Sequence, residues 1–188
     1  MYLILGLGNL GPQYELTRHN IGFIVADTLA EKHGVTLDTD GHYSRYGTGQ
    51  IQDHPVMVAK PMTYMNESGL AAKALITALN ISPHQVIVVY DEIDLQLGKI
   101  KVRHKGGDAG NRGVRSLLHC LRTEEFTRVR VGVGRPECRE DIVDYVLSPF
   151  LEDEWPLVNE TVEKTVEKIE TTLIELNHKK TQSEEEIE

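Results

Sequence analysis

A polar cluster follows the first apolar segment of this 188-residue chain. Tyr2–Leu5 predicts a short strand that ends at Gly6. Amide, phenol, guanidinium and imidazole groups then gather within a dozen residues: Asn9, Tyr14, Arg18, His19 and Asn20. An imidazole changes its charge near neutral pH, so it can take a proton from water and return it. The cluster therefore suits general base chemistry, although His19 can equally be a surface or capping residue.

A carboxylate ends another apolar segment. Val86–Tyr90 is a continuous apolar run, typical of a strand that is covered on both faces, and Asp91 follows it directly. Open α/β sheets bind their ligands at the carboxyl ends of such strands. We therefore expect Asp91 to lie at a ligand-binding edge of the sheet.

The glycines after the first strand allow a second interpretation. Gly6, Gly8 and Gly11 form the G-x-G-x-x-G pattern of dinucleotide-binding proteins. That fingerprint needs a helix at once, whereas Pro12 follows here and helical spacing begins only near Ile21. A nicotinamide-dependent oxidoreductase stays an alternative, but no cofactor is expected.

The spacing of the histidines, cysteines and serines supports neither a metal site nor a serine nucleophile. The eight histidines form no H-E-x-x-H pair, and Cys120 and Cys138 stand apart from them. The G-x-S-x-G motif of serine esterases is absent as well. We expect no metal site.

Alternating strand and helix patterns must position these groups. Apolar runs or alternation predict five strands, and residues at helical spacing predict helices between and after them. The strands are Tyr2–Leu5, Val56–Ala59, Val86–Tyr90, a segment around Ile100 and Val102, and Val129–Val133; the helical stripes cover Ile21–Leu29, Leu70–Leu79, Val114–Leu121 and Trp155–Leu176. The predicted fold is α/β: a single domain, residues 1–178, with a mixed, mostly parallel twisted sheet covered by helices on both faces. The polar, acidic residues 179–188 are expected to form a disordered tail.

The charge is distributed unevenly along the chain. The net charge is −9, but residues 151–188 carry 12 acids and 4 bases, which leaves the rest nearly neutral. Between Lys99 and Arg122, seven Lys or Arg stand against one acid, Asp108. Such a local basic patch can bind phosphates even on an acidic protein, because salt screens charges beyond about 8–10 Å. A solvated face of mixed charge is the alternative.

The composition indicates the broad class of protein. The chain is 40% hydrophobic and 26% charged, and no apolar run is long enough to span a bilayer. No basic and apolar leader precedes the first strand, and two unpaired cysteines fit a reducing compartment. We expect a cytoplasmic protein without membrane contact, and nothing requires more than a monomer.

Three motifs carry a family resemblance. GLGNLGPQYELTRHNIGF at 6–23, KPMTYMNESG at 60–69 and YDEIDLQLGKIKVRHKGG at 90–107 resemble, in order, the bacterial peptidyl-tRNA hydrolases over roughly residues 1–150. The resemblance implies hydrolysis of the ester between a peptide and tRNA, with water as the nucleophile. It implies that His19 is the general base, that Asp91 orients it, and that Asn9 distinguishes a blocked amino group from a free one. A buried carboxylate would fix the tautomer of the imidazole and stabilise its charged form.

The resemblance also implies binding residues. Asn66 would position the ester, Tyr14 and Tyr64 would stack on the terminal bases, and Met65 would line the groove for the peptide. Arg103 and Arg130 would clamp the 5′-phosphate of the tRNA, since a guanidinium matches phosphate oxygens. From the residues alone, Asn9 can be a turn former, Asn66 a helix cap and Met65 a packing residue.

Two positions depart from the family pattern. Leu10 stands where a proline is usual, and the glycine-rich loop GGDAGNRG has Asn111 and Arg112 in place of a His-Asn pair. The second residue of that pair is the family's tRNA-contacting asparagine. Either Arg112 contacts the acceptor backbone in its place, or the loop is shifted by one residue and Asn111 makes the contact. Two related functions stay open: an RNA-binding relative without hydrolysis, and an esterase for unblocked aminoacyl-tRNA.

Overall fold

A single mixed sheet forms the centre of the molecule. The structure is a computed structural model that describes the backbone of residues 1–185 and the side chains of residues 1–178. Within these residues, seven strands pair in the order β2-β3-β4-β1-β5-β7-β6. They are β1 (Tyr2–Gly6), β2 (Thr39–Gly41), β3 (Ser44–Ile51), β4 (His54–Pro61), β5 (Val86–Glu92), β6 (Ile100–Arg103) and β7 (Thr127–Gly132).

The strands at the middle of the sheet run parallel. β1 pairs with β4 and β5, and β5 pairs with β7, all in parallel register. On one side of these strands β3 pairs antiparallel with β4, and on the other β6 pairs antiparallel with β7. At the edge of the sheet, β2 forms a hairpin with β3. The carboxyl ends of β1, β4 and β5 therefore meet at one edge, which is where ligands of such sheets bind.

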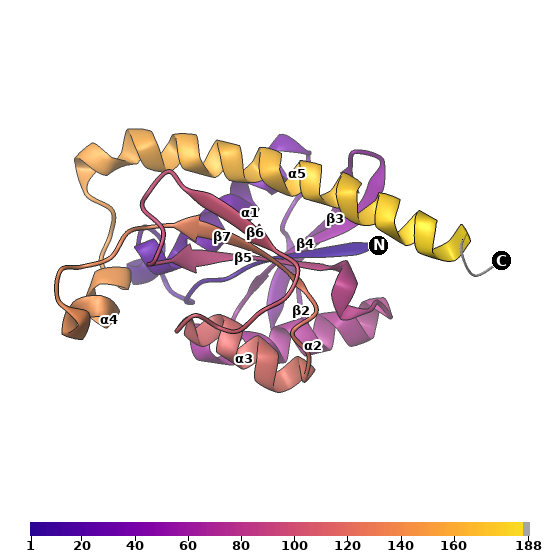
Figure 1. Ribbon diagram of the computed structural model, residues 1–188, viewed down its shortest axis with the longest axis horizontal. Helices are drawn as coiled ribbons and strands as arrows, with labels where there is room; N and C mark the ends of the chain where they lie inside the picture. The colour runs from indigo at the N-terminus through magenta and orange to yellow at the C-terminus, as the bar shows by residue number, and fades with distance from the viewer. Residues whose placement is uncertain (186–188) are drawn as a thin grey trace.

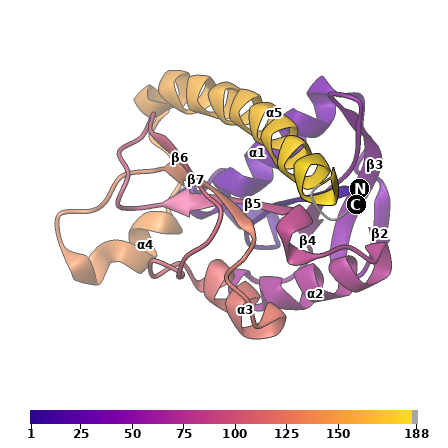
Figure 2. The ribbon, with the colours of Figure 1, turned by 45° about the vertical axis from the view of Figure 1, so that its right-hand side comes forward.

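Helices cover both faces, as the sequence predicts (Figure 1). α1 (Ile21–Lys32) and α5 (Trp155–Glu185) pack on one face through an apolar cluster. α2 (Ser68–Leu79) and α3 (Arg112–Leu121) pack on the opposite face. The short helix α4 (Ile142–Val146) stands beside the body of the molecule (Figure 2). Six short 3-10 helices connect these elements in the described chain: η1 (Pro12–Tyr14), η2 (Arg18–Asn20), η3 (Met65–Glu67), η4 (Pro83–Gln85), η5 (Arg139–Asp141) and η6 (Glu152–Glu154). None of the helices described is long and apolar enough to cross a membrane.

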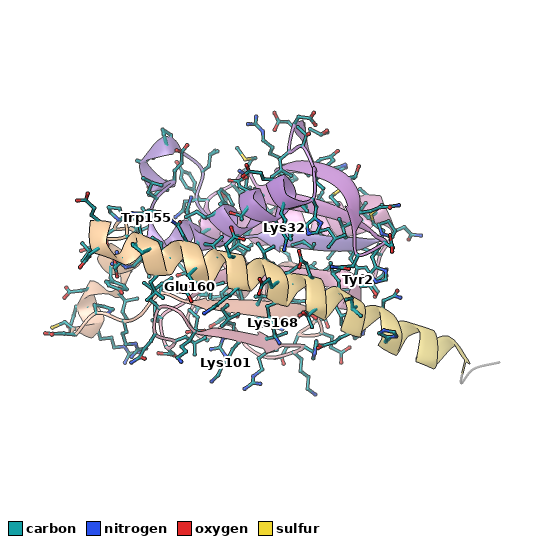
Figure 3. All side chains as sticks on the ribbon, turned by 90° about the horizontal axis from the view of Figure 1, so that it is seen from above. Tyr2, Lys32, Lys101, Trp155, Glu160 and Lys168 are labelled. Carbon is teal, nitrogen blue, oxygen red and sulfur yellow. The ribbon has the colours of Figure 1, made fainter. Side chains whose placement is uncertain are left out.

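The last helix ends later than the sequence predicts. We expected the folded domain to stop at residue 178, but α5 continues to Glu185, and its last turns project past the sheet (Figure 3). Its sequence contains no glycine and no proline after Pro156, so nothing interrupts the backbone hydrogen bonds. Of the predicted tail, residues 186–188 lie outside the described part of the chain.

The β2–β3 hairpin was not predicted. β3 has glycine at positions 47 and 49 and few apolar residues, so its sequence lacks the pattern of a buried strand. The glycines have a packing reason: a Cβ on Gly47 would lie 2.1 Å from the carbonyl oxygen of Thr36. The chain before β2 crosses this strand too closely for any side chain at that position.

Candidate active site

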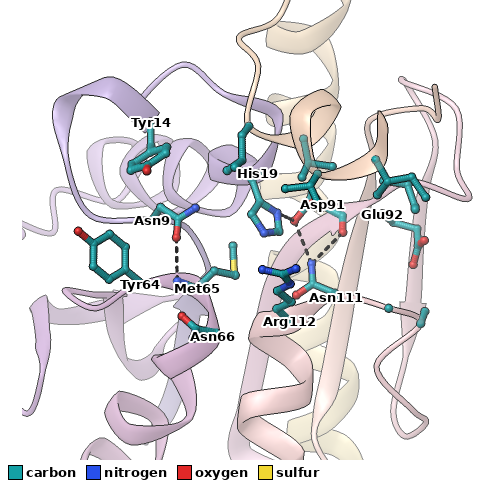
Figure 4. A pocket seen from close by; sticks show the side chains of 17 residues that line it. Asn9, Tyr14, His19, Tyr64, Met65, Asn66, Asp91, Glu92, Asn111 and Arg112 are labelled. Carbon is teal, nitrogen blue, oxygen red and sulfur yellow. Dashed lines mark hydrogen bonds and ion pairs between the residues drawn. The ribbon is translucent and has the colours of Figure 1, made fainter. Parts of the chain in front are cut away.

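The predicted site residues converge at the carboxyl edge of the sheet (Figure 4). Asn9 follows β1, and His19 lies in η2. Asp91 is the last residue but one of β5, and Asn66 lies in η3 after β4. These groups line one open cavity of about 270 Å³, together with the start of α3 and the face of α4. Segments far apart in the sequence thus meet at one cavity.

His19 and Asp91 form a buried pair. Nδ1 of His19 lies 2.8 Å from Oδ1 of Asp91, and the two residues are 8% and 4% exposed. The same carboxylate oxygen accepts a hydrogen bond from Nδ2 of Asn111 at 3.0 Å. With Nδ1 donating to the carboxylate, a neutral imidazole carries its lone pair on Nε2. That nitrogen is available to take a proton within the cavity.

Asn9 is held by hydrogen bonds that fix the direction of its amide. Its Oδ1 accepts from the backbone N–H of Met65 at 2.8 Å. Its backbone N–H and carbonyl pair with the side chain of Asn20 at 2.8 and 3.0 Å. Because Oδ1 is engaged, the NH₂ group is the part of Asn9 that turns toward His19 (Figure 4). The cavity therefore contains an oriented amide donor.

Aromatic and apolar side chains form the opposite wall. Tyr64 and Asn66 are exposed and Tyr14 is half-buried, and all three line the cavity. Met65 lines it as well but is only 3% exposed and belongs to the core, so it both packs and forms the cavity floor. The N-cap of α2 is Glu67, so Asn66 does not cap that helix.

Asn111 is engaged within the chain. Its Oδ1 caps α3 by accepting from the N–H groups of Gly113 and Val114, at 2.9 and 3.1 Å, while its Nδ2 reaches Asp91. The first residue of α3, Arg112, lines the cavity and is exposed. Among the described side chains, no ion-pair partner contacts Arg112.

The glycine-rich loop is closed by an ion pair. Nε of Arg115 donates to Oδ2 of Asp108 at 2.9 Å, and Oδ1 of Asp108 accepts from the N–H of Gly110 at 2.7 Å. The Arg115 guanidinium holds the pKa of the Asp108 carboxyl below its ordinary value. The acid that sequence analysis finds inside the basic stretch is thus paired with an arginine of the helix that follows the loop.

Arg103 and Arg130 lie on the same face of neighbouring strands. In the β6–β7 register, Lys101 stands opposite Arg130 and Arg103 opposite Arg128, so these four side chains share a face. Arg103 is exposed, whereas Nε and Nη2 of Arg130 contact Oε2 of Glu92 at 2.7 and 2.5 Å. The Glu92 side chain is only 2% exposed, so a buried carboxylate holds Arg130 in place.

Sequence analysis did not reveal the burial of Arg128 on β7. Arg128 alternates with the valines of β7, and it is only 2% exposed. Its guanidinium lies 3.9 Å from the ring centre of Phe126 and donates to the carbonyl of Gly106, and burial lowers the pKa of Arg128. Beside it, burial raises the pKa of Tyr90 to about 12, so the phenol stays neutral. The glycine-rich loop covers Arg128, which no local pattern reveals.

A second omission is the apolar wall on α4. Ile142, Val143, Val146 and Leu147 line the cavity beside Asp91 and Glu92. Their spacing marks one helical face, which could have indicated a helix in a segment for which we predicted none. No metal-binding group of three or more His, Cys, Asp or Glu occurs among the described residues.

A mixed α/β sheet thus holds a buried histidine–carboxylate pair at its carboxyl edge, an arrangement that suits general base chemistry. The model of the family "Peptidyl-tRNA hydrolase" matches residues 3–187, and the chain belongs to this family.

Curated and solved relatives span most of the chain. The peptidyl-tRNA hydrolase of Geobacillus thermodenitrificans is 48% identical over 162 residues, 86% of this chain and 87% of its own. That of Bacillus subtilis is 42% identical over 173 residues, 92% of each chain. The crystal structure of the Acinetobacter baumannii enzyme superposes with a TM-score of 0.85 at 34% identity, covering 90% of this chain and 86% of the other.

Proposed function

We propose that this chain hydrolyses the ester bond of peptidyl-tRNA, with water as the nucleophile, and so releases the peptide and a tRNA that can be used again. The observation that carries the proposal is the buried pair of His19 and Asp91, 2.8 Å apart, at the wall of a cavity that also contains the oriented amide of Asn9. Membership of the peptidyl-tRNA hydrolase family supports the choice of substrate.

The reaction begins at Nε2 of His19. This nitrogen takes a proton from water while the water oxygen bonds to the ester carbonyl carbon, whose oxygen becomes an oxyanion. The tetrahedral intermediate then collapses: the bond to the ribose oxygen breaks, and that oxygen receives the proton back from His19. The products are the peptide acid and a tRNA with a free terminal hydroxyl.

Neighbouring groups hold these atoms in place. Asp91 stabilises the imidazolium that forms during the attack, and Asn111 keeps the carboxylate oriented. The NH₂ group of Asn9 donates to an amide carbonyl that a blocked substrate has and a free aminoacyl ester lacks. Asn66 positions the ester from the other side of the cavity.

The tRNA occupies the aromatic and basic side. Tyr14 and Tyr64 stack on its terminal bases, and Arg112 contacts the acceptor backbone. Arg103 and Arg130 take the 5′-phosphate, with Arg130 oriented by Glu92. Met65 forms the floor under the peptide. We further propose that the chain acts on tRNA as a monomer, in the cytoplasm and without a cofactor.

The test compares N-acetyl-aminoacyl-tRNA with unblocked aminoacyl-tRNA. The wild type should cleave the blocked ester, and His19→Ala should lower turnover by about 10²–10⁴-fold while tRNA affinity stays the same. His84→Ala is the matched control, because that histidine is exposed and pairs with Glu125 outside the cavity. Tight tRNA binding without cleavage would contradict the proposal and define an RNA-binding protein. Equal cleavage of both esters would indicate an aminoacyl-tRNA esterase.

A further inference from the structure

Arg18 connects the turn that carries His19 to the segment that follows α4. Its Nη1 donates to Oγ of Ser148 at 3.2 Å and to the carbonyl of Pro149 at 2.5 Å, and its Nη2 donates to Glu154 at 2.6 Å. The backbone N–H of Arg18 adds a bond to the carbonyl of Ser148 at 3.1 Å. One side chain therefore holds several points of this segment.

Two aromatic rings enclose the same guanidinium. Its central carbon lies 4.4 Å from the ring centre of Tyr145 and 5.2 Å from that of Phe150. Tyr145 belongs to α4, and its hydroxyl donates to the carbonyl of Val133 at 2.7 Å. Arg18 itself is 4% exposed. A buried cation with this many partners is costly to leave unpaired, so its contacts define one arrangement of the segment.

α4 depends on such an attachment. It has five residues, fewer than an isolated helix needs to be stable, and it does not lie against the sheet like the other helices (Figure 2). Its apolar residues Ile142, Val143 and Val146, with Leu147 directly after it, nevertheless form a wall of the cavity. The wall can keep its distance from His19 only if something outside α4 fixes it.

We propose that Arg18 is a positioning residue that sets the distance between the base and the α4 wall, and through it the binding of apolar peptides. This inference rests on the proposed function for its substrate. His19 itself is held separately, by Asp91 on β5 and by Asn111 behind it. Loss of the Arg18 side chain therefore loosens the wall, which keeps the Tyr145–Val133 bond and the backbone bond to Ser148, and it leaves the base oriented.

The first measurement is amide hydrogen exchange of Arg18→Gln and Arg18→Lys. Exchange over residues 142–150 should become about tenfold faster in Arg18→Gln, because the segment opens locally, while β1 and β5 keep their protection. Arg18→Lys, which keeps the charge but not the planar fork, should restore part of the protection. Fluorescence of the single tryptophan should shift too, since Trp155 packs on Phe150 at 5.5 Å. Arg45→Gln is the matched control: Arg45 binds Asp40 on the exposed β2–β3 hairpin.

The second measurement compares substrates with N-acetylglycine and with a longer apolar peptide. In Arg18→Gln, KM for the apolar peptide should rise about tenfold, because contacts with an apolar wall discriminate on that scale. KM for N-acetylglycyl-tRNA, kcat and the pH profile of kcat should stay near the wild-type values. A merely structural defect would instead affect both substrates alike.

The outcomes separate this inference from the proposed function. Unchanged exchange over 142–150 in Arg18→Gln overturns it, whether or not the chain cleaves any ester. A lower kcat with a displaced pH profile also overturns it, because Arg18 would then act through His19. If Arg18→Gln does not fold, Glu154→Gln removes only the carboxylate charge and should give smaller changes in the same direction. If the wild type cleaves no ester, the proposed function fails, and exchange alone decides whether Arg18 holds α4.

Discussion

The two sides of the cavity hold their polar groups in different ways. Around His19, the ring Nδ1, the Asp91 carboxylate and both ends of the Asn111 amide are engaged within the chain. On the basic side, Arg112 at the cavity and Arg103 on β6, outside the cavity lining, are exposed, and neither has an ion-pair partner among the described side chains. Under the proposed function, the groups around His19 are arranged before the substrate arrives, whereas the exposed arginines become ordered on binding it.

The difference separates chemistry from recognition. Groups that must meet developing charge are most effective when they are already oriented, because they need no reorganisation during the reaction. Exposed arginines lose up to about 2 kcal/mol of side-chain entropy each on ordering, but they can adapt to a flexible phosphate backbone. Arg130 combines both features: its side chain shares a face with Lys101 and Arg103, but its guanidinium is held by the buried Glu92 carboxylate. Substitutions should therefore affect rate on one side and salt-dependent affinity on the other.

The largest effect is expected from Asp91→Asn. Asparagine keeps an oxygen for both donors but loses the negative charge that stabilises the imidazolium, so turnover should fall by about 10²-fold or more. The acid limb of the pH–rate profile should move to lower pH, because the charged ring loses a neighbouring anion. Asp94→Asn, at an exposed acid that pairs with Arg135, is the control. An unchanged rate would remove Asp91 from the reaction.

The pair of Arg130 and Glu92 tests the intermediate case. Arg130→Gln leaves a buried carboxylate without its partner, so urea denaturation should show a loss of about 2–3 kcal/mol. The double variant with Glu92→Gln should regain most of that stability, because no buried charge is then left unpaired. If the single variant is as stable as the wild type, Arg130 belongs with the exposed cations.

Arg103→Gln should have a smaller effect, limited to binding. tRNA affinity should fall severalfold and the slope of log K against log salt should decrease by about one, as expected for one phosphate contact. Stability and kcat should not change, since Arg103 is exposed. Lys164→Gln removes one positive charge on α5 and is the control for net charge. Equal salt slopes for Arg103→Gln and the wild type would place the phosphate elsewhere.

The smallest effect is expected from Glu170→Gln, far from both sides of the cavity. Burial alone would raise the pKa of Glu170, but hydrogen bonds from Lys32 and His33 outweigh it and lower the pKa below the ordinary 4.5. A lowered carboxyl pKa stabilises the fold above the ordinary value, and that stabilisation disappears as pH falls through the lowered one. Glu170→Gln should therefore cost about 1 kcal/mol or less at pH 7 and nothing at strongly acid pH. Thermal unfolding at both pH values would measure this, and equal losses would contradict it.

The sequence reveals whatever depends on local pattern. Apolar runs predicted β1 and β5, and helical spacing predicted α2, because burial on the sheet requires those periods. The motif resemblance placed His19 and Asp91 as partners, and the structure brings their side chains within hydrogen-bond distance. The sequence alone could not show which polar side chains form hydrogen bonds within the chain and which remain available for a ligand.

Arg128 and Asn111 illustrate that limit. Arg128 alternates with valines like an exposed base, but it is buried, and a carbonyl of the glycine-rich loop is one of its three acceptors. Asn111 was considered as a tRNA contact, yet α3 and Asp91 engage its side chain. The Arg128–Gly106 and Asn111–Asp91 bonds join residues 22 and 20 positions apart, and spacing carries no information about such partners. The cap that Asn111 provides for α3 is local, and an asparagine there is an ordinary helix-start signal.

The position of α5 has a consequence for synthesis of the protein. All cavity-lining residues precede position 148, whereas α5 covers one face of the sheet with residues from Val158 to Leu173. A chain that has just extended past Leu147 thus holds every reacting group but leaves an apolar face of the sheet bare. Completion of the last helix, rather than of the last cavity residue, is the step in translation that closes the core behind the site.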